Sequence, residues 1–195
     1  MMNNVKILAL IASLGLTTLI TGCSDVISAG REEPIRENPG NRTVGSYIDD
    51  EVIETLSLVN LNKGSEEMKA SNISVTSYNG LVLLTGQAPS DAARAEAEQI
   101  VSQIRKVRKI HNEVKISGVS SAIARSNDLW ITTKVKAQLL TNESVDGSRI
   151  KVVTDGSTVY LMGLVSTQEA DIAINIVRNI TGVEKIVKVF EYVNL

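Results

Sequence analysis

Two stretches of this chain carry the same pattern of apolar and turn residues, about 77 positions apart, and this internal repeat is the strongest constraint on the fold. The stretch from Ile73 to Gly86 matches the stretch from Ile150 to Gly163 in its apolar positions and in its closing glycine. Apolar positions on either side of these stretches repeat as well, with slips of one residue that loops can absorb. Each copy has about 65 to 70 residues, a size at which an isolated core is marginal. We therefore expect two modules that pack against each other.

Each copy shows the same order of signals: a helical stretch, two strands joined by a tight turn, a second helix and a last strand. The pairs Asn79-Gly80 and Asp155-Gly156 tolerate the positive φ that hairpin turns require. Apolar residues alternate along the hairpin strands, which predicts a sheet with one buried face. These residues are Ile73, Val75, Val82 and Leu84 in the first copy and Ile150, Val152, Val159 and Leu161 in the second. The predicted fold class is α+β, with two tandem αββαβ modules, each a small three-stranded mixed sheet packed on two helices.

Turn and capping residues set the expected boundaries. The second helix of each copy starts near Ser90 and Ser166, and Ser166 with Glu169 has the spacing of a capping box. A segment with two prolines and no apolar period precedes the first copy, which predicts a flexible tether over residues 23–46. We expect the first module over 47–117, a linker containing Ser and Ala over 118–126, and the second module over 127–195.

The N-terminus has the features of an export signal. Lys6 is followed by fourteen uncharged residues, Ile7 to Ile20, a run shorter than the ~20 apolar residues that a membrane-spanning helix needs. The run ends in Leu19-Ile20-Thr21-Gly22-Cys23, which resembles the lipobox of bacterial lipoproteins. That resemblance implies removal of residues 1–22 and attachment of diacylglycerol and an N-acyl chain to Cys23, with no other cofactor. The alternative is that Cys23 is an ordinary thiol.

The charge balance and the scarcity of cysteine and histidine exclude several classes of function. Twenty Lys and Arg against 22 Asp and Glu give a net charge of −2, so no cationic field draws the chain to nucleic acid. One cysteine excludes an intrachain disulfide and a multi-cysteine zinc cage, and His111 has no second histidine to share a metal ion. No phosphate loop, nucleophile elbow or nucleophile–base pair is visible. We assign no catalytic residue, no metal site and no enzyme activity, and we interpret His111 as structural.

The helix expected at the start of the second module has two apolar faces. On a wheel of about 100° per residue, Ile131, Val135 and Leu139 fall together as the natural core face. The other face carries Leu129, Trp130, Thr133, Ala137 and Leu140, flanked by Lys134 and Lys136. A tryptophan beside lysines suits the interface of an anionic membrane. The same face also suits packing between the two modules, and the pattern leaves both placements open.

The duplicated αββαβ pattern behind a lipobox resembles the BON domain family. The segment from Ser126 to Leu140 is similar to the first helix of the second domain in dual-BON outer-membrane lipoproteins, and residues 72–87 and 152–164 also match the family. The resemblance extends over residues 44–195. It implies a lipoprotein on the periplasmic face of the outer membrane that binds anionic phospholipid through this helix and supports outer-membrane integrity. Ser24 agrees with that location, because an aspartate after the cysteine would favour the inner membrane.

The resemblance also implies which side chains contact phospholipid. The family's positions fall on Trp130, Val135 and Leu140 of this sequence, and Lys134 and Lys136 join them as the flanking cations. The helix wheel places Val135 on the core face, so this residue is assigned to two faces at once. An anionic phospholipid membrane is therefore the expected partner, and the oligomeric state stays open.

Three further expectations concern surfaces. The same helix also suits a scaffold that docks on an envelope assembly or cell-wall protein, with the lipid serving as an anchor alone. In the first copy Ser57 replaces Val135, and Val52, Leu56 and Val59 form an apolar face that we expect to pack against the other module. The four cations within 105–109 suit a solvated loop or an anionic headgroup site.

Overall fold

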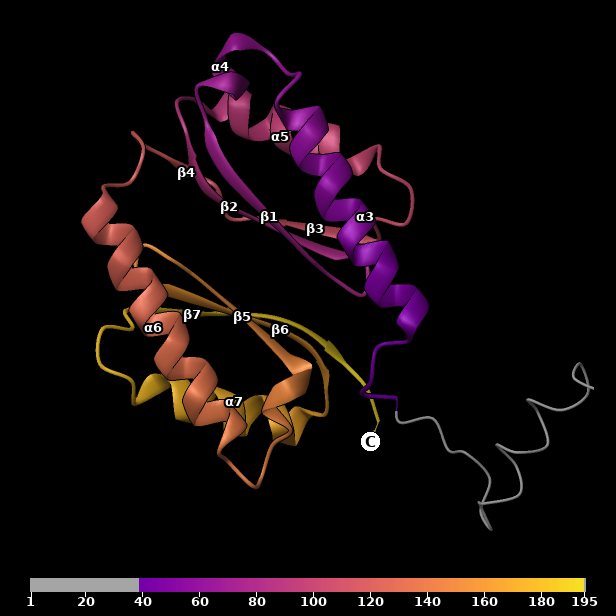
Figure 1. The fold of residues 1–195 in the computed structure, drawn as a ribbon, viewed down its shortest axis with the longest axis vertical. Coiled ribbons are helices and arrows are strands. Elements are labelled where there is room, and N and C mark those ends of the chain that lie inside the picture. The colour runs from indigo at the N-terminus through magenta and orange to yellow at the C-terminus, as the bar shows by residue number, and fades with distance from the viewer. Residues whose placement is uncertain (1–38, 195) are drawn as a thin grey trace, which may run out of the picture. The chain divides into compact units, whose positions relative to one another are not determined.

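The computed structural model describes residues 39–194 (Figure 1). The signal sequence, Cys23 and the tether up to residue 38 lie outside the described residues, so the statements made about them stay predictions. The first module contains α3 (Val44–Leu61), α4 (Glu66–Lys69), β1 (Asn72–Tyr78), β2 (Leu81–Ala88), α5 (Asp91–Ser102), β3 (Lys109–Asn112) and β4 (Lys115–Ile116). The second contains α6 (Ala122–Leu140), the short 3-10 helix η1 (Gly147–Arg149), β5 (Ile150–Asp155), β6 (Thr158–Val165), α7 (Thr167–Arg178) and β7 (Lys185–Tyr192).

Both modules have the αββαβ order and the mixed sheet that the repeat predicts. In the first, β2 pairs antiparallel with β1 and parallel with β3 and β4, which are two pieces of one interrupted last strand. In the second, β6 pairs antiparallel with β5 and parallel with a continuous β7. The predicted α+β fold class is confirmed.

The first hairpin turn has the predicted backbone conformation, the second has its positive φ angles one residue later than the predicted Asp155-Gly156, and a helix residue holds each turn. Positive φ angles occur at Asn79 and Gly80, at 53° and 75°, and at Gly156 and Ser157, at 54° and 59°. Asp50 of α3 accepts hydrogen bonds from the amides of Asn79 and Gly80, at 2.7 and 2.9 Å. Asp128 of α6 accepts equivalent bonds from the amides of Gly156 and Ser157, each at 2.9 Å. The first helix of each module is thereby fixed on its hairpin.

Capping residues move two expected boundaries. The Thr43 hydroxyl accepts a hydrogen bond from the amide of Ser46, so α3 begins at Val44, inside the segment expected as a tether. The Ser121 hydroxyl accepts one from the amide of Ala124, so α6 begins at Ala122, inside the segment expected as a linker. The predicted capping box of Ser166 and Glu169 is present. Both helices start earlier than expected for the same reason. Each begins directly after its capping residue, and this point lies before the periodic apolar pattern from which the start was predicted.

Each module has its own core beneath its helices, and a third core joins the two modules. Every residue of β2 and β6 is buried, which corrects the prediction of a sheet with one buried face. One face of each strand lies against the helices of its own module. The other faces meet in a shared cluster of Tyr78, Leu81, Leu83, Tyr160, Met162, Leu164 and Val189. Packing one sheet on the other supplies the burial that each small module lacks alone.

Polar contacts surround this shared cluster. The Tyr78 hydroxyl donates to the carbonyl of Arg149 at 2.7 Å. The guanidinium of Arg108 donates two hydrogen bonds to the carboxylate of Glu191, both at 2.9 Å, and the amine of Lys151 lies 2.8 Å from the carboxylate of Glu54. Residues 38–195 accordingly form one compact unit.

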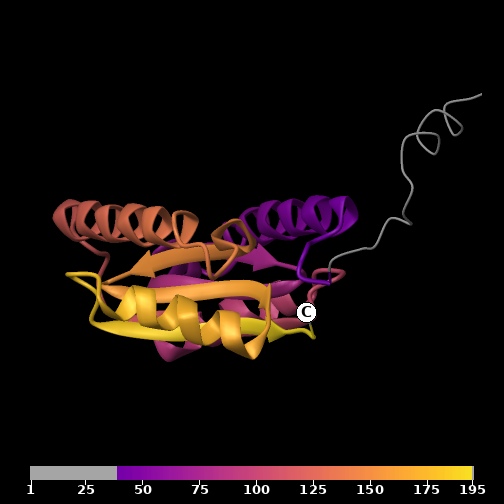
Figure 2. The ribbon, with the colours of Figure 1, turned by 90° about the horizontal axis from the view of Figure 1, so that it is seen from below.

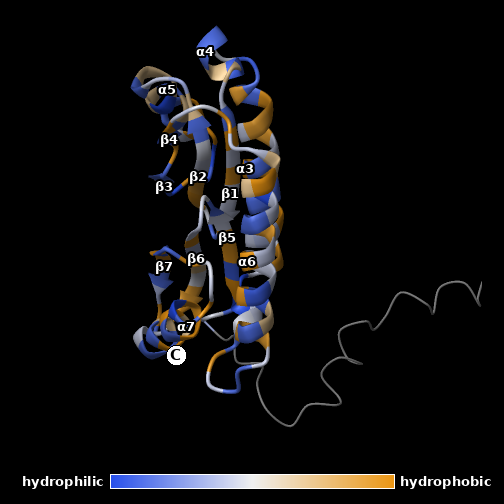
Figure 3. Ribbon diagram, turned by 90° about the vertical axis from the view of Figure 1, so that its left-hand side faces the viewer, coloured by the Kyte–Doolittle hydropathy of each residue, from blue (hydrophilic) through white to orange (hydrophobic). Residues whose placement is uncertain are grey.

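The first helices of the two modules lie on a common side. Figure 2 shows α3 and α6 in one layer beside the sheets. Figure 3 shows the same two helices along one side of the modules, with α5 and α7 on the opposite side. A broad, flat surface that contacts α6 on the side away from its sheet therefore also approaches α3.

Candidate functional site

The outward face of α6 is the main apolar surface of the second module. Leu129, Trp130 and Leu140 are 68%, 46% and 63% exposed. Ile131 and Leu139, which the wheel places on the core face, are buried. The predicted separation into two faces is confirmed. Trp130 and Leu140 belong to none of the three cores, so the alternative in which they pack between the modules is wrong.

Val135 does not belong to this outward face. Its side chain is fully buried in the core of the second module, beside Ile131 and Leu139. The structure therefore corrects its assignment as a phospholipid contact and agrees with the wheel. Its spacing of four residues from each neighbour puts it in the middle of the stripe that faces the sheet.

Trp130 is oriented by two neighbours. The amine of Lys134, one turn along the helix, lies 4.0 Å from the centre of the indole ring, in cation–π geometry. The ring also approaches Gly182 in the loop between α7 and β7, where a Cβ would lie 3.6 Å from it. The indole is thus held at the surface with one cation already in place over it.

The charges on α6 are separated between its two faces. Its sequence contains Arg125, Lys134 and Lys136 and a single acid, Asp128. The carboxylate of Asp128 is buried and accepts the turn amides described above, while the three cations are exposed. The outward face of α6 is therefore apolar and cationic, without an exposed acid on the same helix.

The corresponding face of α3 is exposed as well. Val52, Leu56 and Val59 are 49%, 44% and 44% exposed, and no core includes them. The expectation that this face packs against the other module is wrong. The shared cluster forms between strands instead, which leaves the outer surfaces of both first helices free.

The four cations within 105–109 form no single site. Lys106 pairs with Asp49 at 2.6 Å and Arg108 pairs with Glu191, so two of the four hold elements of the protein together. His111 lies on β3, and burial followed by the charge of Lys109 lowers its pKa below the usual value, which favours the neutral form. This arrangement agrees with the structural role assigned to His111.

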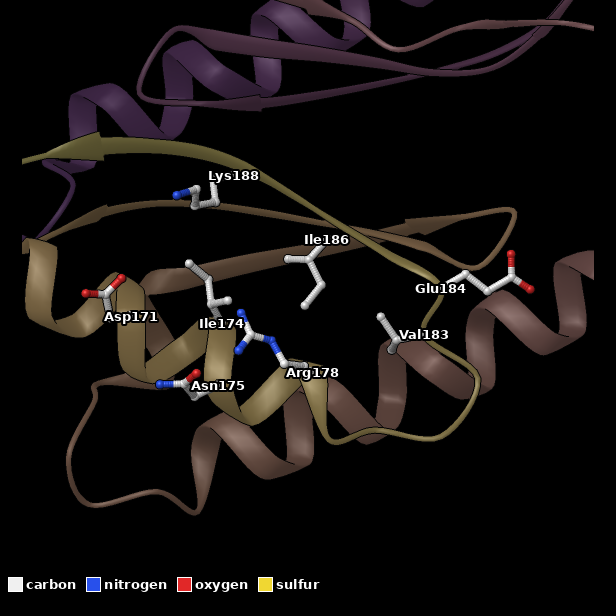
Figure 4. A pocket seen from close by; sticks show the side chains of 8 residues that line it. All are labelled: Asp171, Ile174, Asn175, Arg178, Val183, Glu184, Ile186 and Lys188. Atoms are coloured by element: carbon white, nitrogen blue, oxygen red, sulfur yellow. The ribbon is translucent and has the colours of Figure 1, made fainter.

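A cavity of about 640 Å³ lies between α7 and β7 in the second module (Figure 4). Its charged lining consists of two carboxylates and two cations, Asp171, Glu184, Arg178 and Lys188. Figure 4 shows Glu184 apart from the other three, and the remaining lining residues are Ile174, Asn175, Val183 and Ile186. The lining offers no thiol, hydroxyl or imidazole that could act as a nucleophile or general base.

Residues 39–194 contain neither a metal-binding cluster nor a membrane-spanning helix. No group of three or more His, Cys, Asp or Glu side chains is placed to hold a metal ion there. No helix of that region combines the length and the apolar character needed to cross a bilayer.

Comparison with known proteins matches both modules to the BON domain model, over residues 49–118 and 127–194. The chain belongs to the BON domain family. It is 31% identical over 181 residues to "Outer membrane lipoprotein DolP" of Haemophilus influenzae, covering 93% of this chain and 94% of that protein. It is 38% identical over 152 residues to "21 kDa hemolysin" of Actinobacillus pleuropneumoniae, covering 78% of each chain. It is also 26% identical over 146 residues to "Osmotically-inducible protein Y" of Escherichia coli, covering 73% of this chain and 72% of that one.

These matches confirm the tandem BON arrangement. The sequence indicated that arrangement and the outward position of Trp130 and Leu140, but three features were missed. Sequence reasoning did not include Ile123, 83% exposed near the start of α6, or the exposure of α3, and it did not assign Asp50 and Asp128 to the turns. The repeat of these aspartates before the core positions Ile53 and Ile131 was the available signal.

Proposed function

We propose that this chain is a non-enzymatic lipoprotein, anchored at the periplasmic face of the outer membrane through acyl chains on Cys23, whose second BON domain binds anionic phospholipid. The match to an outer membrane lipoprotein over nearly the full length of both chains supports the location. Support for the binding role comes from the outward face of α6. In this role the protein maintains outer-membrane integrity.

The observation that carries the proposal is the composition of that face. Leu129, Trp130 and Leu140 offer apolar side chains that can enter the region between headgroups and acyl chains, and an indole suits this depth. Lys134 and Lys136 lie beside them and can attract anionic headgroups, at about 1 kcal/mol for each cation. One helix face of this size binds weakly and reversibly. Attachment at Cys23 would compensate for this weak affinity, because it raises the local concentration of headgroups.

The test measures co-sedimentation of the lipid-free chain from Ser24 to Leu195 with vesicles of anionic or zwitterionic phospholipid. All three cores lie within 39–194, so this chain keeps the whole folded unit. We expect binding to anionic vesicles that weakens as salt rises. Trp130→Glu should weaken it by more than about tenfold, because a charge replaces an interfacial indole.

A matched control places the same charge elsewhere. Asn175→Glu alters an exposed residue of α7, on the opposite side from α6, and should leave both vesicle binding and thermal stability unchanged (Figure 3). Equal binding by wild type and Trp130→Glu would contradict the proposal. Absence of binding to either vesicle by a stable wild-type chain would favour the scaffold, in which the α6 face docks on an envelope protein.

A further inference from the structure

The first module carries a second exposed apolar surface, which we call the α3 face. Its side chains are between 44% and 79% exposed and follow one side of the helix, namely Val44, Tyr47, Ile48, Val52, Leu56 and Val59. A shallow apolar groove runs along part of it. A contiguous apolar strip of this kind on a folded protein marks a contact surface.

The acidic residues of α3 are mostly neutralised by neighbours. Asp49 pairs with Lys106, Asp50 with Arg42 and Glu54 with Lys151, at 2.6 to 2.8 Å. Glu51 is the one acid of α3 without an ion pair among the described residues, and it lines the groove. The face thus presents apolar side chains with a single free carboxylate, a small obstacle to contact with a membrane.

The α3 face lies on the same side of the molecule as the α6 face. Figures 2 and 3 show both helices in one layer, with α5 and α7 on the other side of the modules. The pairing of Glu54 with Lys151 connects α3 to the second module, and the shared cluster joins the two sheets. A bilayer that receives α6 therefore meets α3 as well, because the two modules belong to one compact unit.

The length of chain before α3 keeps this helix close to the proposed anchor. Val44 follows Cys23 by so few residues that even a fully extended chain reaches at most about 75 Å. A lipid at Cys23 thus holds the α3 face within reach of the surface in which it is inserted.

We propose that the α3 face enters the same bilayer surface as the α6 face, so that the protein lies on the membrane through two helices. This inference rests on the proposed function and extends it, since α6 supplies the cations and α3 supplies most of the apolar contact. Amphipathic helices that lie in the membrane plane bury such a strip at the boundary between headgroups and acyl chains. A second copy of the chain is the competing occupant, and the experiment distinguishes the two.

Environment-sensitive fluorophores at single cysteines test each helix separately. The lipid-free chain from Ser24 to Leu195 has no cysteine, because Cys23 is the one cysteine of the sequence. Val52→Cys reports on α3, Leu140→Cys reports on α6, and Asn175→Cys is the control, at an exposed position of α7 on the opposite side of the modules. We expect a blue shift at positions 52 and 140 on adding anionic vesicles, with quenching by lipids brominated in the acyl chains, and neither change at position 175.

Each other outcome has a defined meaning. Shifts at position 140 alone would overturn the inference and leave the proposed function standing. A shift at position 52 alone would keep the α3 contact and contradict the role of α6, whereas no shift at either position would contradict both. A shift at position 52 that grows with protein concentration in the absence of vesicles would overturn the inference in favour of a second copy.

A charge change on the α3 face gives an independent test. Glu51→Gln removes its one free carboxylate, and we expect binding to anionic vesicles to strengthen by about twofold to fivefold. Asp171→Asn removes an exposed carboxylate on the far side, on α7, and should leave binding unchanged. Equal affinities of Glu51→Gln, Asp171→Asn and wild type would count against the proposal.

Discussion

The helices α3 and α6 occupy the same place in the two modules and have opposite charge. Four acids and no lysine or arginine lie in α3, whereas α6 contains three cations and one buried acid. Their inward faces agree closely, since each buries residues at spacings of three and four and each holds a hairpin turn with an aspartate. The inward faces of the two copies have stayed similar because each must pack on its sheet, whereas the outward faces have diverged.

One inward position also differs. Ser57 in α3 occupies the place of Val135 in α6, and both side chains are fully buried. The Ser57 hydroxyl has no hydrogen-bond partner among residues 39–194, whereas Val135 fills the core of its module with methyl groups. A buried unpaired hydroxyl lowers stability, so the first module is less well packed at this point than the second.

The largest expected effect breaks the turn contacts. Asp50→Ala removes a carboxylate that accepts bonds from Ser77, Asn79, Gly80 and Arg42. We expect the free energy of unfolding to fall by about 4 kcal/mol, because buried donors and a half-buried cation lose their partner. Asp128→Ala removes two amide contacts and should cost about 2 kcal/mol. Urea denaturation of both variants measures the difference, and equal losses would show that the two turn contacts are equivalent.

The next largest effects are expected from changes at the inward position that differs between the modules, Ser57 in α3 and Val135 in α6. Val135→Ser should lower the free energy of unfolding by about 2 to 3 kcal/mol, since it deletes buried methyl groups and buries a hydroxyl. Ser57→Ala should raise it by about 1 kcal/mol by removing the unpaired hydroxyl. Thermal unfolding of both variants and of the wild type shows whether Val135→Ser lowers the stability and Ser57→Ala raises it. Destabilisation by Ser57→Ala would mean that the hydroxyl has a partner in solution.

The pH dependence of stability tests the first module alone. Burial raises the pKa of Asp50, but hydrogen bonds from Ser77, the amides of Gly80 and Asn79, and Arg42 outweigh it, so the pKa is lower than usual. A carboxylate with a lowered pKa stabilises the fold above its unfolded pKa of about 3.9, and this stabilisation is lost as pH falls through the folded pKa. Asp50→Asn should therefore be less stable than wild type at pH 7, with a difference that narrows below about pH 4. A constant difference from pH 7 to pH 2 would contradict this assignment.

The smallest effects are expected from single charge changes, which compare how the two modules contribute to membrane binding. Lys134→Gln and Lys136→Gln should each weaken binding to anionic vesicles by about fivefold at low salt and by less at moderate salt. Lys63→Gln, just beyond the end of α3, provides a matched loss of charge in the first module and should change binding less. Vesicle titrations at two salt concentrations measure these differences. An equal effect of all three changes would indicate that net charge, and not the α6 face, attracts the membrane.

Most of the fold could be predicted from the repeat, because periodicity and turn chemistry are local. Asn79-Gly80 and Asp155-Gly156 identified the hairpins, and Ser166 identified a helix start. The starts of α3 and α6 were placed late, since capping by Thr43 and Ser121 precedes any apolar period. For the candidate site, the wheel separated Trp130 from Ile131 but offered no means of deciding what covered the outer face.

The sequence by itself determined the two modules, their element order, the core stripe of α6 and the cationic character of that helix. These features follow from side-chain spacing, backbone preferences and charge, which act over a few residues. Only the tertiary structure decided that β2 and β6 meet face to face and that Val135 is inaccessible. It also decided that the outer faces of α3 and α6 are both uncovered on one side. The physical reason is that the pattern of apolar residues along a helix is the same in the sequence whether a sheet, a second module or a membrane covers them.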